Sequence, residues 1–176
     1  MKQFGKLLWS LIEKIALWCL KILFKIIHKE LTPEIEEGFL QFVKFGLVGV
    51  TNTVISYVIY VCVILILTPA HVSWDIYVGN IVSFILSVLW SFYWNNRFVF
   101  AKKDGESRNL WKALIKTYAS YSFSGLILAN ILSWVWVDLL GISKFLAPII
   151  NLLVTIPLNF IMNKFWAFKT EKSEEN

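Results

Sequence analysis

The side chains of this sequence that could bind a ligand are mostly asparagine amides set in apolar segments. An amide in hydrocarbon must find a hydrogen-bond partner, although an interhelical bond of this kind contributes only about 0.6 kcal/mol. One interpretation is that the asparagines hold helices together, which is the simpler one for any single residue. The other is that they line a polar groove that binds hydroxyl groups. The candidate groove residues are Asn52, Asn80 and Asn159, with Asn95 and Asn163 nearer the ends of their segments.

Two basic residues, Arg97 and Lys164, lie where two of these apolar segments end. Both could anchor the segment ends among lipid headgroups, because their long stems reach toward water. Guanidinium and ammonium groups are also suitable donors to a phosphate. The two roles are compatible, since headgroup phosphates lie at the same depth. Nearby aromatic residues are expected to form an interfacial belt: Phe98, Phe100, Trp166 and Phe168.

No other pattern indicates catalysis or metal binding. The sequence has no paired catalytic carboxylates, no nucleophile–base set and no glycine-rich phosphate loop, so we expect neither an enzyme nor a cofactor. Cys19 and Cys62 lie far apart in apolar runs without metal-ligand spacing. His28 and His71 are isolated. We therefore expect no metal site.

Composition identifies the elements that must position these residues. Of the 176 residues, 57% are hydrophobic and only 16% are charged, and the mean hydropathy is +0.64. A soluble domain of this length needs more polar surface. Continuous charge-free runs of about 20 residues suit helices that cross a membrane, and they exclude the alternating strands of a barrel. We predict an all-α polytopic membrane protein with four spans, at residues 43–67, 76–95, 116–138 and 145–163.

Basic residues predict the orientation of these spans. All of the 17 lysines and arginines except Lys144 lie on one side of the predicted membrane. By the positive-inside rule, both termini should be cytoplasmic. The net charge of +5 is then a matter of topology and attraction to anionic lipid, and we expect no nucleic-acid partner.

Residues 1–31 form a separate region that is apolar but interrupted by lysines. Lys14 alone makes insertion of this segment costly. Lysines and large apolar residues fall on opposite arcs of a helix, which predicts an amphipathic helix in the membrane plane. We favour a membrane-surface anchor over a docking helix for a partner. Thr32-Pro33 then starts the main domain, residues 32–172, and residues 173–176 are an acidic tail.

The sequence also contains an internal repeat. SFYWNNRFVF (91–100) and NFIMNKFWAF (159–168) align at a shift of 68 positions, which pairs Asn95 with Asn163 and Phe100 with Phe168. Phe42-Val43-Lys44 also resembles Leu114-Ile115-Lys116. These similarities predict two helical hairpins inserted the same way round, a parallel duplication. Such repeats commonly place a site at their interface.

These motifs resemble the GtrA-like family of small four-helix membrane proteins. Residues 159–168 match the family's closing pattern N-F-x-x-N-R/K-x-W-x-F at every fixed position. The segment with Gly49, Asn52 and Thr53 looks like its opening pattern. The first ending departs from the closing pattern at Ser91 and Phe98. The resemblance covers residues 39–168 and leaves the N-terminal helix outside.

The resemblance implies a role in cell-surface polysaccharide or teichoic acid glycosylation. Family members work with a membrane glycosyltransferase and are proposed to flip a polyprenyl-phosphate-linked sugar across the cytoplasmic (inner) membrane, which would then be the location of this multi-pass protein. Arg97 and Lys164 would then bind the phosphate while the asparagine groove receives the sugar. A non-transporting scaffold for the glycosyltransferase is the alternative, and the sequence leaves a homo-oligomer open. A small multidrug-type exporter is disfavoured because the acids that border the spans, Asp75 and Asp138, lie at their outer ends.

Overall fold

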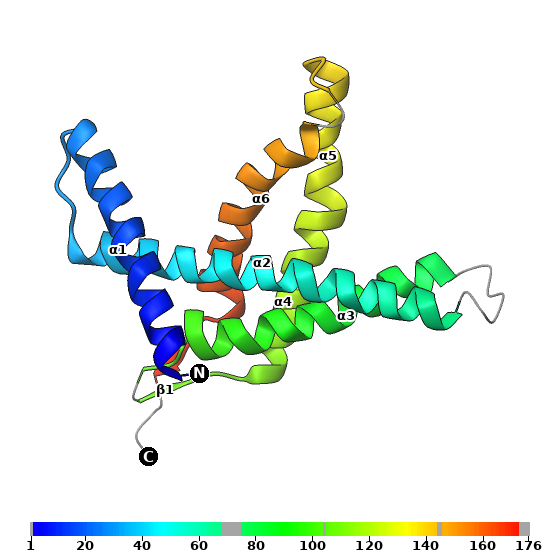
Figure 1. The fold of residues 1–176 in the computed structure, drawn as a ribbon, viewed down its shortest axis with the longest axis horizontal. Coiled ribbons are helices and arrows are strands. Elements are labelled where there is room, and N and C mark those ends of the chain that lie inside the picture. The colour runs from blue at the N-terminus through cyan, green and yellow to red at the C-terminus, as the bar shows by residue number, and fades with distance from the viewer. Residues whose placement is uncertain (1, 68–74, 104, 144–145, 173–176) are drawn as a thin grey trace. The chain divides into compact units, whose positions relative to one another are not determined.

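The computed structural model describes residues 2–67, 75–103, 105–143 and 146–172, which are mostly helical (Figure 1). The α-helices are α1 (Lys2–Ile26), α2 (Pro33–Leu67), α3 (Asp75–Trp94), α4 (Leu110–Ser122), α5 (Ala129–Trp134) and α6 (Ala147–Met162). Wider π-helical turns continue or join them: η2 (Asn95–Val99), η3 (Phe123–Leu128), η4 (Val135–Leu139) and η5 (Asn163–Ala167). Through η3, the helices α4 and α5 form one continuous rod.

Among the described residues, four helical stretches are long and apolar enough to cross a membrane. They are Pro33–Leu67, Val78–Val99, Leu110–Leu139 and Ile149–Ala167. These stretches confirm the predicted fold class, an all-α protein with four spanning helices. The first and third helices start earlier than the predicted spans, because turns that carry charged residues, such as Glu34 and Lys112, continue the same helices beyond the charge-free runs. The predicted acidic tail, 173–176, lies outside the described residues.

The chain divides into two compact units, of which the first is Met1–Phe45. Within it, α1 and the first turns of α2 pack side by side: Lys21 Nζ lies 3.8 Å from Glu36 Oε1, and Lys44 Nζ lies 5.0 Å from the centre of the Trp9 ring. Large apolar side chains of α1 remain exposed at helical spacing, at Leu7, Leu11, Ile15, Trp18, Ile22 and Ile26. This pattern suits an amphipathic helix, whose location on a membrane surface stays a prediction.

The second unit begins at Gly46 and packs mainly through small and polar residues. In it α4 contacts both α3 and η5, the turn that follows α6. Buried positions recur every three or four residues along α3 and α4: Ser83, Ser87 and Ser91, and Ala113, Thr117 and Ser120. Small side chains let helix backbones approach closely, which is what associates helices within lipid. The α4 helix thereby joins the two halves of the repeat.

A short antiparallel ladder, which the sequence did not predict, pairs β1 (Glu106–Ser107) with β2 (Glu171–Lys172). It links the segment after the first repeat ending to the segment after the second. Beside it, the Glu106 carboxylate accepts the backbone N–H of Lys103 at 3.0 Å, which holds the pKa of that carboxyl below its ordinary value.

Candidate functional site

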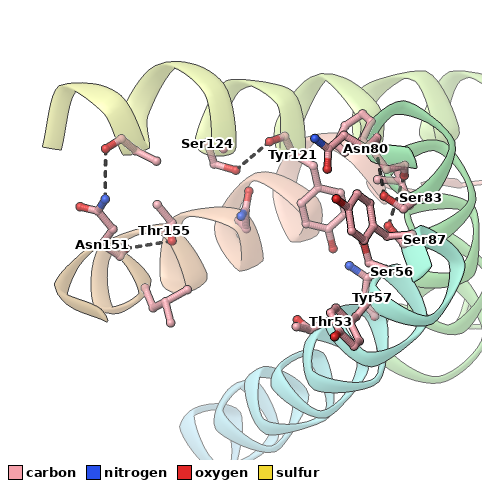
Figure 2. A pocket seen from close by; sticks show the side chains of 18 residues that line it. Thr53, Ser56, Tyr57, Asn80, Ser83, Ser87, Tyr121, Ser124, Asn151 and Thr155 are labelled. Atoms are coloured by element: carbon pink, nitrogen blue, oxygen red, sulfur yellow. Dashed lines mark hydrogen bonds between the residues drawn. The ribbon is translucent and has the colours of Figure 1, made fainter. Parts of the chain in front are cut away.

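A cavity of about 700 Å³ lies within the second unit. Eighteen residues line it, and they come from α2, α3, α6 and the rod of α4, η3 and α5 (Figure 2). The last lining residues of α3 and α6 are Val88 and Asn159, so the cavity ends nine positions before Arg97 and five positions before Lys164. Its volume falls in the range of about 300–1,000 Å³ that is typical of small-molecule sites.

Three of the predicted groove residues, Asn52, Asn80 and Asn159, line this one cavity although they come from three different helices. Asn80 is exposed. The amide oxygens of Asn52 and Asn159 are buried and have no hydrogen-bond partner among the described residues. A buried polar atom without a partner is costly. Both side chains therefore have unused hydrogen-bonding capacity beside the cavity.

Hydroxyl groups make up much of the remaining wall, and sequence analysis missed them. Ser83, Ser87 and Ser124 line the cavity, together with Thr155 and Tyr121 (Figure 2). A single serine or threonine in an apolar run carries no distinctive signal. The spacing of four residues between Ser83 and Ser87, which places both on one helix face, could have indicated a polar wall.

Asn151 also lines the cavity, but its amide is fully used for packing. Its Nδ2 donates to Ala129 O at 3.1 Å and to Ser133 Oγ at 2.8 Å, while its Oδ1 accepts Trp136 Nε1 at 3.0 Å. The helix-contact interpretation thus fits this residue. Asn130 lies outside the lining, and its exposed amide donates to Leu126 O of its own helical rod at 2.6 Å.

The other two predicted groove residues, Asn95 and Asn163, do not line the cavity. Both are completely buried at the repeat endings. Asn95 Nδ2 donates to Ser91 Oγ at 3.1 Å, and Asn163 Nδ2 donates to Asn159 O at 2.7 Å. Ser91 Oγ in turn bonds the hydroxyl of Tyr121 at 2.9 Å. Asn163 thus bonds a lining residue, Asn159, and Asn95 is linked through Ser91 to another, Tyr121.

The backbone closes in the same way at both endings. Phe100 N donates to Asn95 O at 2.7 Å, and Phe168 N donates to Asn163 O at 2.8 Å, each completing a π-helical turn. The predicted equivalence of the two copies therefore extends to their backbone geometry. Turns of this kind are rare and often occur at functional sites.

Phenylalanines of the two copies pack reciprocally. Phe92 stacks on Phe168 with ring centroids 5.5 Å apart, and its counterpart Phe160 stacks on Phe100 at 5.9 Å. Between these pairs, Phe100 and Phe168 stack on each other at 4.9 Å. Each contact has its mirror in the other copy, as at a two-fold interface.

The structure separates the four aromatics that the sequence grouped in one interfacial belt. Phe98 and Trp166 are 52% and 43% exposed, as a belt requires. Phe100 and Phe168 are 5% and 2% exposed, so their assignment to the belt is wrong. Their place is the core between the two repeat endings, where each ring is covered by other aromatic rings.

A duplicated ending among four spanning helices can be compared with known families. The family model for the GtrA/DPMS transmembrane domain matches residues 44–168. The chain belongs to this family. Within the matched range lie the cavity and both repeat endings of the GtrA/DPMS domain, while α1 lies outside it. No curated protein and no solved structure matches the chain.

The two predicted phosphate-binding residues of the GtrA/DPMS domain have different surroundings. Arg97 is exposed on η2. Lys164 is partly covered, since its Nζ lies 5.5 Å from the centre of the Phe160 ring and 5.7 Å from that of Phe165. Neither residue lines the cavity. A ligand that contacts both the cavity and one of these cations must therefore extend along the helices.

Arg108 connects the two endings of the GtrA/DPMS domain, a role that the sequence did not reveal. Its Nη1 donates to Asn96 Oδ1 at 2.7 Å and to Phe100 O at 2.9 Å. Its guanidinium lies 5.2 Å from the centre of the Phe168 ring. One side chain thus binds both copies at their basic ends.

Proposed function

We propose that this membrane protein moves a polyprenyl-phosphate-linked sugar from one leaflet to the other without catalysing a covalent step. The observation that carries the proposal is the uncharged, hydrogen-bonding wall of the cavity among four spanning helices. An apolar lipid tail makes no hydrogen bonds to such a wall. A sugar that crosses hydrocarbon needs the wall to replace the hydrogen bonds that its hydroxyls lose to water. Membership of the GtrA/DPMS family and the resemblance to GtrA-like proteins support the same substrate class.

Lys164 is the better candidate to bind the phosphate while the sugar lies in the cavity. It follows Asn159, a lining residue, by five positions, which corresponds to a rise of about 7 Å along the helix. Arg97 follows Val88, the last lining residue of α3, by nine positions, or about 13 Å. A phosphate joined directly to a sugar lies within the shorter distance. Arg97 would then bind a phosphate only before entry.

The proposed setting is the cytoplasmic membrane, with both termini on the cytoplasmic side. There a membrane glycosyltransferase would supply the lipid-linked sugar to the basic ends of the helices. The basic residues on that side would attract anionic headgroups and hold the orientation. The sugar would be delivered to the opposite leaflet for attachment to a surface polymer.

Reconstitution in vesicles tests the proposal. A polyprenyl-phosphate hexose is placed in one leaflet, and its appearance in the other is followed with membrane-impermeant periodate. We expect the protein to speed this appearance at least about tenfold over empty vesicles, and Asn52→Leu to remove most of the gain. Asn130→Leu is the matched control, because Asn130 is exposed and lies outside the lining. A rate equal to that of empty vesicles would contradict the proposal.

The alternative is a scaffold that stabilises a membrane glycosyltransferase, and one observation on α2 favours it. A Cβ added at Gly46 or Gly49 would meet no atom of the described residues within 4 Å. Glycines left open on a spanning helix suit close packing against another helix. The scaffold would be favoured if the protein gave no flipping in vesicles but co-purified with the glycosyltransferase. Gly49→Leu should then abolish the co-purification.

A further inference from the structure

An apolar groove lies between α2 and α3. It has a volume of about 260 Å³, and its walls are Leu47, Val48 and Thr51 of α2 and Trp90 and Trp94 of α3. The hydroxyl of Thr51 donates to Val48 O at 2.9 Å and accepts Trp90 Nε1 at 3.3 Å. The indole nitrogen of Trp94 is covered by the protein itself. The groove therefore presents mainly carbon atoms to a ligand.

The groove follows the polar cavity directly along both helices. On α2, the groove residue Thr51 immediately precedes Asn52, which lines the cavity. On α3, Val88 lines the cavity, and Trp90, two positions later, lines the groove. The two sites are therefore neighbours on the same pair of helices, and the groove lies on the side of the cavity that leads to the basic end of α3.

A row of aromatic rings connects the groove to that basic end. The rings of Trp90 and Trp94 meet edge to face with centroids 5.4 Å apart, and the Trp94 ring stacks on Phe98 at 4.9 Å. Phe98 is exposed, and so is Arg97, the residue before it. A cation thus lies at the end of the groove that is farther from the cavity, and a guanidinium is a suitable partner for a phosphate.

The groove is also open to the bilayer through α2. No residue in the most apolar stretch of this helix is buried. Leu47 and Thr51, two of the three groove residues of α2, are exposed. An apolar chain can therefore reach the groove from the side, without passing through the basic end.

A ligand that matches this order of surfaces has a phosphate joined to a long apolar chain. A groove within the membrane retains such a chain by close packing, because lipid tails are as apolar as its walls. We infer that the groove holds the first isoprene units of the lipid while its phosphate lies at Arg97, before the sugar enters the cavity. This inference rests on the proposed function and gives the tail of its substrate a binding site.

Photolabelling tests the inference. The probe is a sugar-free polyprenyl phosphate with a photoreactive diazirine on its first isoprene unit, added to the full chain in phosphatidylcholine nanodiscs. We expect mass spectrometry to find the label on groove residues. Unlabelled polyprenyl phosphate should suppress this labelling at least about fivefold more than the same amount of phosphatidic acid, which has a phosphate but acyl chains. Equal suppression by the two lipids, or labels spread over all four spanning helices, would overturn the inference.

Filling the groove provides a variant with a matched control. Val48→Trp places a large ring in the groove, and we expect labelling of the groove residues of α3 to fall at least about fivefold. Val50→Trp makes the same change two positions later, at a side chain that is exposed and lines neither the groove nor the cavity. It should leave the labelling unchanged. Equal labelling of the two variants, both folded by size-exclusion chromatography, would contradict the site.

The vesicle assay separates this inference from the proposed function. Acceleration of the polyprenyl-phosphate hexose (the hexose lipid) without labelling of the groove would overturn the inference and leave the proposed function in place. The expected labelling without any acceleration would support the lipid site and contradict flipping. An unlabelled groove in a protein that is dimeric by size-exclusion chromatography would assign the groove to a second copy and overturn the inference.

Discussion

The two repeat endings share a backbone but have different surroundings. At the first, Asn95 donates to the side chain of Ser91, and Arg97 is exposed. At the second, Asn163 donates to the backbone of Asn159, and aromatic rings cover Lys164. Asn159 lines the cavity, whereas its counterpart Ser91 does not.

The duplication has therefore kept the way in which the helices end, while of the two endings only the second, through Asn159, brings a side chain to the cavity. The shared part, the π-helical turns and the exchanged phenylalanines, closes the basic end of the unit. The part that differs brings a free amide and a cation within one substrate's length. We expect substitutions in the shared part to affect stability and those in the differing part to affect transport.

Removing a ring from the shared core should have the largest effect. Phe168→Ala loses stacking on Phe92 and Phe100 and the contact with Arg108, and we expect a loss of about 3–5 kcal/mol in unfolding free energy. Phe98→Ala, at an exposed ring, should cost less than about 1 kcal/mol. Thermal unfolding in detergent, followed by tryptophan fluorescence, measures both. Similar shifts in the unfolding temperature of the two variants would show that the stacked phenylalanines between the repeat endings contribute little to stability.

Breaking the link between the two endings should have the next largest effect. Arg108→Gln loses charge-assisted bonds to Asn96 and Phe100, and we expect a loss of about 2 kcal/mol. Arg108→Lys should recover only part of it, because an ammonium cannot reproduce the planar fork of a guanidinium. Lys112→Gln, at an exposed position of α4, is the control. The same unfolding assay would contradict the link if Arg108→Gln and Lys112→Gln behaved alike.

Neutralising the two cations separately should have the smallest effect and bears on the difference between the copies. Lys164→Gln is expected to slow flipping of the hexose lipid about tenfold, because it removes the charge closest to the cavity. Arg97→Gln should change the rate less than about twofold. The vesicle assay measures both at equal protein content. A larger effect at Arg97 would reverse the assignment of the phosphate site.

Much of the fold could be predicted because its signals lie in contiguous sequence. Apolar runs define the spanning helices, since membrane thickness sets a length that few other structures need. The pairing of Asn95 with Asn163 follows from comparing two short segments. The presence of Asn52, Asn80 and Asn159 in one wall followed from the cost of burying an amide in hydrocarbon.

The remainder depends on contacts between distant residues. Phe98 and Phe100 look alike beside a basic residue, and only packing against the second copy makes one exposed and the other buried. Arg108 resembles any linker cation until the Phe168 ring, 60 positions later, lies under it. The cavity serines went unnoticed because their small side chains suit helix packing equally well.

The reciprocal exchange of phenylalanines has a consequence for the history of the chain. In an isologous dimer, two identical subunits meet across a symmetry axis, so every contact occurs twice with the roles of the subunits reversed. The contacts between the two halves of this chain follow the same rule. A single hairpin would leave the rings of Phe92 and Phe100 without their partners from the second copy. Such an interior is what the fusion of two copies of one hairpin would produce. Fusion would let the two copies differ, as they do at Ser91 and Asn159, of which only Asn159 lines the cavity.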